Sequence, residues 1–70
     1  MGEPVIYCRV KRSSVAGWFI ESAYAGHLAW TGAHWVPHVD GASITYRVAF
    51  WGRELDAKRN AKINGFVVID

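Results

Sequence analysis

A block of aromatic and β-branched residues between positions 18 and 36 constrains the fold more than any other part of the sequence. Three of the four tryptophans lie in it, within Trp18-Phe19-Ile20, Leu28-Ala29-Trp30 and His34-Trp35-Val36. Turn signals that contain Gly26 and Gly32 separate these segments, and glycine supplies the positive φ that tight turns need. We therefore predict a three-stranded antiparallel meander whose inner face forms the centre of the fold.

The size of the chain limits how it can be stabilised. Its 70 residues form one domain at most, spanning 1–70, and such a chain buries only about 60% of the surface that its unfolded form exposes. Cys8 is the only cysteine, so an internal disulfide is excluded, and a lone thiol fits a reducing compartment. No apolar run approaches the ~20 residues of a membrane span. We expect a cytoplasmic protein without a membrane partner, stabilised by an aromatic core or by dimerisation.

Alternating residues predict further strands on both sides of the block. Val5–Val10 and Ser43–Phe50 each alternate with a period of two, which is the pattern of a strand with one buried face. Phe66–Ile69 is a continuous apolar run, which is typical of a buried central strand. These runs bring the number of predicted strands to six.

The same alternation assigns the aromatic side chains to the two faces of the sheet. Trp18 and Trp30 are predicted to be buried on the core face. Phe19, Trp35 and Trp51 fall on the opposite face or at strand ends. One side of one sheet can hardly bury all ten aromatic residues of such a small chain, so we expect some of these rings to be exposed.

Arg53–Lys62 consists mostly of helix formers and predicts the one helix of the chain. Glu54 and Asp56 lie in its first turn and Lys58, Arg59 and Lys62 lie later, which suits the helix dipole, and Asn64-Gly65 is a helix stop signal. The residues expected to pack it against the sheet are Leu55, Ile63, Ala57 and Ala61. The sequence therefore predicts an α+β fold of order β-β-β-β-β-α-β. We expect a single antiparallel β-sheet of five or six strands with one C-terminal helix packed on one face.

The sequence offers no catalytic or metal-binding pattern. His34 and His38 are four residues apart, but Pro37 interrupts the strand between them. The residues that would have to complete a site, His27, Asp40 and Cys8, have no recognisable ligand spacing. Cys8 lies on an apolar face, Ser13, Ser14 and Ser43 lie in turns without a motif, and the carboxylates are scattered. We expect no enzymatic activity, no metal and no cofactor.

Basic and aromatic residues are the better candidates for a site. Lys58 and Lys62 lie one turn apart on the predicted helix with Arg59 between them, and Arg47 projects from the outer face of Ser43–Phe50. The candidate partner-binding residues are Lys58, Arg59, Lys62, Arg47, Trp51 and Trp35. The plainer alternatives stay open: the helix cations are an ordinary solvated face, and the rings close a sandwich or a dimer.

Two parts of the chain resemble a group of small phage and prophage proteins. Leu28-Ala29-Trp30 with Gly32 and Trp35-Val36 is similar to their tryptophan hairpin, and 57–61 running into 65–70 is similar to their helix-then-strand unit. Some of these proteins are anti-CRISPR inhibitors, which bind type I surveillance complexes and block target DNA. The resemblance implies a non-enzymatic inhibitor, with Lys58 and Arg59 on a surface that faces the nucleic-acid site of its target.

Three functions remain open from the sequence. The first is a small phage-derived binding protein that inhibits a protein or ribonucleoprotein partner by occlusion. The second is direct nucleic-acid binding by the basic helix, with Trp35, Tyr46 or Trp51 stacking on bases. The third is a structural subunit that only self-associates. We also predict a homodimer, formed either by two faces that carry Phe19, Trp35 and Trp51 or by two edge strands.

Overall fold

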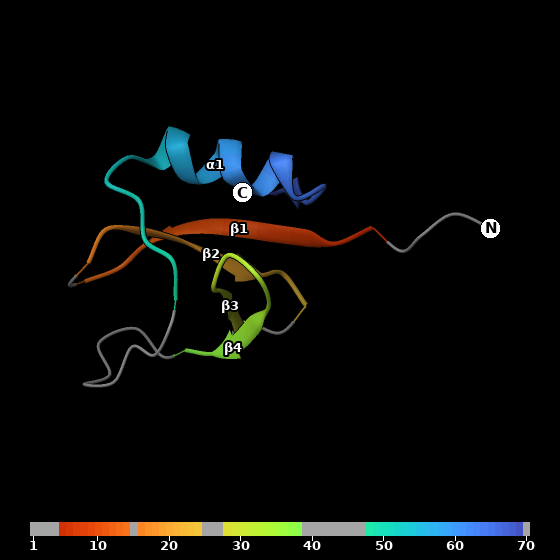
Figure 1. The fold of residues 1–70 in the computed structure, drawn as a ribbon, viewed down its shortest axis with the longest axis horizontal. Helices are drawn as coiled ribbons and strands as arrows, with labels where there is room; N and C mark the ends of the chain where they lie inside the picture. Colours follow the sequence, from red (N-terminus) through yellow and green to blue (C-terminus); the bar gives the residue numbers. More distant parts are fainter. Residues whose placement is uncertain (1–4, 15, 25–27, 39–47, 70) are drawn as a thin grey trace.

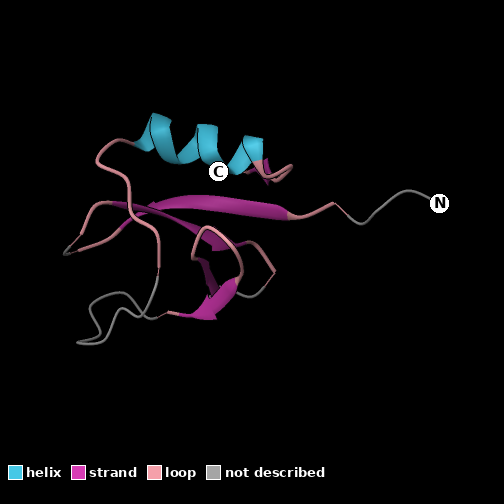
Figure 2. Cartoon of the chain, viewed as in Figure 1, coloured by secondary structure: helices cyan, strands magenta, loops and turns pink. Residues whose placement is uncertain are grey.

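A computed structural model describes residues 5–14, 16–24, 28–38 and 48–69. The elements are, in order, β1 (Tyr7–Arg12), β2 (Trp18–Ser22), β3 (Leu28–Trp30), β4 (Trp35–Pro37), α1 (Glu54–Ile63) and β5 (Val67–Val68). The strands form one sheet of order β4-β3-β2-β1-β5, and α1 lies across one face of it (Figure 1). Figure 2 shows the helix and the strands as two layers. The predicted α+β class, with a sheet of five strands and one C-terminal helix, is confirmed.

The strands from β1 to β4 form an antiparallel meander, whereas β5 pairs with β1 in parallel. The parallel pair arises because α1 carries the chain back across the sheet before β5 begins, as crossover connections do. An entirely antiparallel sheet was expected, so this pair is a difference in detail. A second difference is that β5 lies at the edge of the sheet and not at its centre.

Most of the strand predicted over Ser43–Phe50 lies outside the described residues. Its described end, 48–50, is not part of a strand, but this end and the adjacent Trp51 form backbone hydrogen bonds with the sheet. The backbone N–H of Ala49 donates to the carbonyl of Trp30 at 3.0 Å. Trp18 and Trp51 exchange two backbone hydrogen bonds of 2.8 Å each. This segment therefore follows the sheet before the chain crosses to α1.

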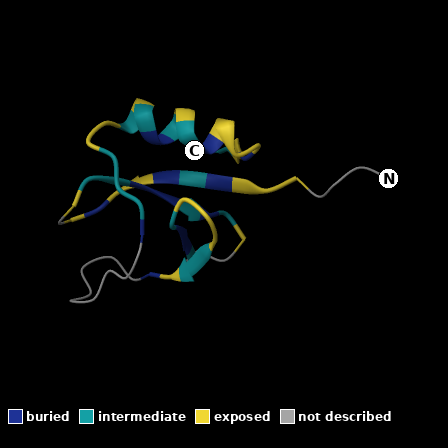
Figure 3. Ribbon diagram, in the orientation of Figure 1, coloured by how far each residue is buried: buried dark blue, intermediate teal, exposed yellow. Residues whose placement is uncertain are grey.

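Apolar side chains are buried on both faces of the sheet, in two clusters. Figure 3 shows buried residues both in the strands and in α1. The cluster under α1 contains Cys8, Val10, Ile20, Trp30, Ala57, Ala61 and Phe66. The cluster on the far face contains Phe19, Ala29 and Val48, with Val36 and Phe50 packed against it. Phe19 and Ile20 are neighbours in β2 and enter opposite clusters, so the predicted alternation of this strand is confirmed.

The structure corrects the predicted positions of three tryptophans. Trp30 is buried as expected, but Trp18 is only half-buried. Trp35 does not lie on the far face: it is paired directly with Trp30 across β3 and β4, so the two rings share a face and their centroids lie 5.1 Å apart. Trp51 likewise packs against the cluster under α1.

Of Phe19, Trp35 and Trp51, only Phe19 lies on the far face of the sheet, and it is 2% exposed. The rings of Phe50 and His38 pack edge-on against it, with centroids 6.0 and 4.8 Å away. The open aromatic face from which a face-to-face dimer was predicted is therefore absent from the described part of the chain. Of the two predicted routes to a dimer, the described residues still offer the pairing of edge strands.

The helix packs on the sheet through its alanines and not through its large apolar residues. Ala57 and Ala61 are fully buried, whereas Leu55 and Ile63 are 52% and 81% exposed. An α-helix turns by about 100° per residue. Leu55 lies two positions from Ala57, and Ile63 lies two positions from Ala61, so each is rotated by about 200° from the buried side. The expectation that all four would face the sheet was wrong for this geometric reason.

Candidate functional site

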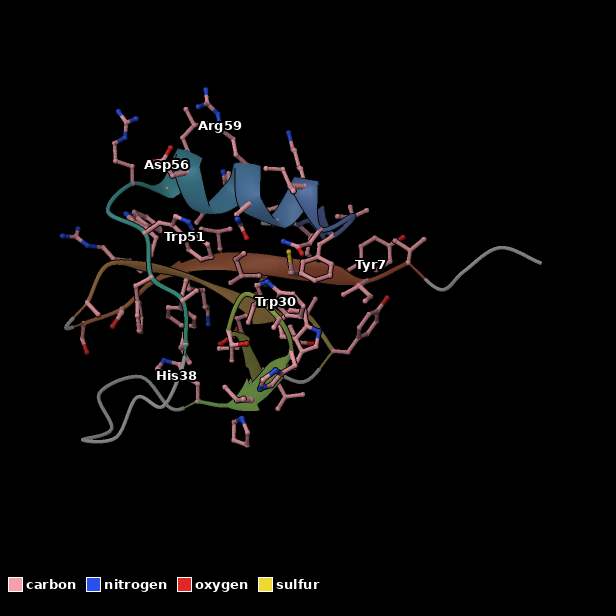
Figure 4. The ribbon with its side chains drawn as sticks, in the orientation of Figure 1. Tyr7, Trp30, His38, Trp51, Asp56 and Arg59 are labelled. Carbon is pink, nitrogen blue, oxygen red and sulfur yellow. The ribbon has the colours of Figure 1, made fainter. Side chains whose placement is uncertain are left out.

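The side of α1 that points away from the sheet combines cations with apolar side chains. We call it the outer face of α1 and define it by Leu55, Arg59, Lys62 and Ile63, all of which are exposed. Ala57 and Ala61 fix the opposite side against β1 and β2. Figure 4 shows the side chain of Arg59 directed away from the sheet. The helix therefore presents this face to solvent on a packed support.

Some basic residues of α1 and its N-cap form ion pairs with nearby carboxylates, and others do not. The Nζ atom of Lys58 lies 3.4 Å from Oε2 of Glu54, and Nε of Arg53 lies 3.4 Å from Oδ2 of Asp56. Arg59 and Lys62 form no ion pair with any other described residue. Exposed pairs of this kind contribute little to stability, but they compensate the charge of their cations locally. The uncompensated positive charge of α1 lies on its outer face.

The structure brings together three of the six predicted site residues. Lys58, Arg59 and Lys62 all lie on α1, with Lys58 at its flank, where its side chain is 30% exposed. Arg47 lies outside the described residues. Figure 4 shows Trp51 on the sheet side of α1, across the helix from Arg59, and Trp35 packs against the ring of Phe66 at a centroid distance of 5.3 Å. The two tryptophans are therefore separated from the cations.

Leu55 and Ile63 belong to the outer face of α1, although their sequence pattern predicted that they would pack against the sheet. Arg59 lies four residues from each of them, so the three side chains form a stripe one turn apart along the helix. The signal was present in the sequence. Two alanines four residues apart already provide a flat inner side, and the helical repeat then turns Leu55 and Ile63 away from it.

Groups that could perform chemistry are few among the described residues. The side chain of Cys8 is fully buried, and this burial raises the pKa of its thiol, so the reactive thiolate is disfavoured at neutral pH. The ring of His38 is buried between Phe19 and Phe50, and neither of its nitrogens has a hydrogen-bond partner among the described residues. His34, by contrast, is exposed.

A metal site is not found in the part of the chain that the structure describes. No group of three or more His, Cys, Asp and Glu residues is arranged there to hold an ion. His27 and Asp40, two of the candidate ligands in the sequence, lie outside the described ranges. Within those same ranges, no helix has the length and apolar character needed to cross a membrane.

The chain matches no family model, no curated protein and no solved structure. Its function is therefore inferred from the geometry of the outer face of α1 and its surroundings.

Proposed function

We propose that this chain is a small, non-enzymatic binding protein that contacts another protein through the outer face of α1 and inhibits it by occlusion. The observation that carries the proposal is the stripe in which Arg59 lies between Leu55 and Ile63. These two apolar side chains are 52% and 81% exposed, and Lys62 is exposed beside them. Arginine flanked by exposed apolar groups is a common composition for the centre of a protein interface.

The same stripe favours a protein over free nucleic acid as the partner. Exposed apolar side chains add affinity only where the partner covers them with apolar groups, and a phosphate backbone offers none. The affinity for nucleic acid depends on how many phosphates the cations neutralise, and only two cations of α1 lack a compensating acid among the described residues. A partner surface that combines carboxylates with an apolar patch fits this face best.

The resemblance to small phage and prophage inhibitors supports the same class of function. Lys58 and Arg59 belong to the helix-then-strand segment that carries the resemblance. We infer an anti-CRISPR-like protein that is phage-derived, acts in the host cytoplasm, needs no cofactor and occludes a protein or ribonucleoprotein complex. We further infer that it works as a homodimer, because a chain of this size has little core of its own.

Charge reversal tests the role of the outer face. The partner is first captured from a host lysate with the wild-type protein and then purified for calorimetric titration. The triple variant Lys58→Glu, Arg59→Glu, Lys62→Glu is expected to fold and to lose binding. Arg59→Glu alone is expected to weaken binding at least about tenfold, which corresponds to ~1.4 kcal/mol.

Arg12→Glu is the matched control, because Arg12 is an exposed arginine at the end of β1 and is not part of the outer face of α1. It changes the net charge as Arg59→Glu does and is expected to leave the affinity within about twofold of the wild type, as for residues outside an interface. A triple variant that folds and binds the partner as tightly as the wild type would remove α1 from the interface.

Direct nucleic-acid binding is the competing function. A titration with oligonucleotides distinguishes it from binding to a protein partner. A basic helix that grips phosphates gives a dissociation constant that weakens steeply as salt is raised. We expect no measurable binding of single-stranded or duplex oligonucleotides at physiological salt. Salt-dependent binding that Arg59→Glu weakens and Leu55→Ser leaves unchanged would favour the nucleic-acid function instead.

A further inference from the structure

The outer edge of β5 is the least protected edge of the sheet. Among the described strands, β5 has β1 as its one neighbour. The N–H of Val67 donates to the carbonyl of Ile6 at 2.9 Å, and the N–H of Ile69 donates to the carbonyl of Cys8 at 2.8 Å. Because backbone groups along a strand point to alternate sides, the N–H and C=O of Val68 point away from β1. Together they offer one donor and one acceptor to another strand.

The two edges of the sheet differ in how they resist such pairing. β4, at the opposite edge, contains Pro37, which has no N–H to donate. Proline and charged side chains are the usual devices that keep an edge strand from pairing. From Phe66 to Ile69 the chain contains neither a proline nor a charged residue. This edge therefore lacks the protection that the β4 edge has.

Exposed apolar side chains gather around the same edge. The structure records seven large exposed apolar side chains among the described residues, and five belong to this end of the sheet. These five are Val5, Ile6, Tyr7, Tyr24 and Val67. Tyr7 is paired with Val67 across β1 and β5, and its ring packs edge-on against Tyr24 at a centroid distance of 6.0 Å. The patch is thus continuous with the edge.

We propose that β5 pairs antiparallel with β5 of a second copy of this chain, about a two-fold axis at Val68. This proposal rests on the homodimer inferred above and places its interface. On the axis, Val68 and its symmetry mate donate one hydrogen bond to each other, which uses the two outward groups of each copy. Val67 then lies opposite Ile69 of the second copy. The side-chain pairs that positions 67, 68 and 69 make across the axis are all apolar, and no like charges meet among them.

The apolar patch is needed because the strand pair itself is short. A stable interface buries roughly 800 Å² on each subunit, which is about a sixth of the 4726 Å² surface of this chain. A strand of two residues cannot supply that area alone. Val5, Ile6 and Tyr7, in and just before the strand next to β5, would supply the remainder, and their burial is favourable because each is at least 37% exposed in one copy. The dimer would join two sheets into one continuous sheet of ten strands.

Light scattering at micromolar concentration tests the interface in the complete chain. We expect the wild type to have twice the 7.8 kDa mass of one chain, and Val67→Lys to have the mass of one. The lysine would place charge in a dehydrated apolar pair on both sides of the axis. Leu55→Lys is the matched control, since Leu55 is similarly exposed but lies at the far end of α1, and it should remain a dimer. Circular dichroism and melting curves establish that each variant is folded.

Amide hydrogen exchange of the wild type provides a second measurement that does not depend on any variant. The N–H of Val68 should exchange slowly in concentrated solution and fast on dilution, whereas the N–H of Val67 should change less because it is bonded within one chain. A dimer that survives Val67→Lys and leaves the Val68 amide unprotected would overturn the β5 interface while leaving the homodimer in place. A mass of 7.8 kDa at every concentration would overturn both. Neither outcome would change the test of α1 against its partner.

Discussion

Gly17 lets two backbone segments approach more closely than any other amino acid would permit. Its φ is +121°, and a Cβ atom added there would lie 2.7 Å from the backbone oxygen of Trp51. That oxygen accepts the hydrogen bond from the N–H of Trp18. The absence of a side chain at this single position therefore allows the start of β2 and the segment before α1 to pair.

Gly17→Ala is expected to reduce the free energy of unfolding by at least ~2 kcal/mol, since it adds an unfavourable φ and a contact with backbone that cannot move aside freely. Gly52→Ala is the control, because a Cβ atom at Gly52 would meet nothing within 4 Å. Urea unfolding measures both. Equal stability of the two variants would contradict the close approach.

The buried thiol of Cys8 should make the free energy of unfolding depend on pH. Burial raises the pKa of its thiol above the ordinary value of 9.0, so the unfolded chain loses this proton at lower pH than the folded chain does. The contribution of Cys8 is therefore fully present below the unfolded pKa and is lost as pH rises above it. Urea unfolding of the wild type and of Cys8→Ala should give parallel curves of unfolding free energy up to about pH 8. The curves should then converge towards pH 10, and curves that stay parallel throughout would contradict the prediction.

At the scale of elements, α1 is attached through small side chains that allow close approach to the sheet. Ala57 and Ala61 have no exposed surface, and buried residues on the strands beneath leave no room for larger groups. The helix is held by this fit and by the rings around it. Its large apolar residues contribute little to the attachment, because they lie on the outer face.

A substitution of a small buried alanine of α1 should therefore destabilise the protein more than the loss of a large apolar side chain on the outer face. Ala61→Leu is expected to destabilise the protein by about 1–3 kcal/mol through overpacking. Ile63→Ala, which removes an 81% exposed side chain, should stay within about 0.5 kcal/mol of the wild type. Thermal unfolding of both variants is the measurement. A larger loss for Ile63→Ala than for Ala61→Leu would show that the outer face is part of the core.

The type and position of an element could be predicted from the sequence where residues close together in the chain determine them. The helix was expected at Arg53–Lys62 and lies at Glu54–Ile63, because helix formers and the Asn64-Gly65 stop act locally. The partners of each element were harder to predict. The parallel pairing of β5 with β1 joins residues about 60 positions apart, and no local pattern specifies it.

The same distinction applies to the candidate site. Lys58, Arg59 and Lys62 were found because they are close together on one helix. Trp35 was assigned to the wrong face because its pairing with Trp30 depends on the register of β3 and β4, which a tight turn between short strands sets. A shift of one residue in that register moves a side chain from one face of the sheet to the other.

At the scale of the whole molecule, β2 couples the two clusters of the core. Ile20 is fully buried in the cluster under α1, and its neighbour Phe19 is buried in the cluster on the far face. Neither cluster can lose its part of β2 without disturbing the other. The described part of the protein should therefore unfold as one cooperative unit.

Trp30→Ala and Phe19→Ala test this coupling from opposite faces. Trp30 packs against Trp35 and Phe66 with centroid distances of 5.1 and 4.9 Å, and each substitution is expected to cost ~3–5 kcal/mol. For both variants, far-ultraviolet circular dichroism and tryptophan fluorescence should give the same midpoint of urea unfolding. Separate midpoints for the two signals would mean that one face of the sheet unfolds without the other.

The parallel pairing of β1 with β5 also has a consequence for the rate of folding. The meander of β1 to β4 forms from turns of a few residues, whereas Val67 must find Tyr7 across a loop of about 60 positions, and closing a long loop costs more entropy than closing a short turn. The meander should therefore belong to the folding transition state, and β5 should join it on the native side of the barrier. Substitutions in β5 would then accelerate unfolding and leave the refolding rate nearly unchanged. A strand that joins the sheet last during folding is also the first to leave it during unfolding. Because the second copy is proposed to pair with β5, dimerisation would hold in place the strand that leaves first and would therefore slow unfolding.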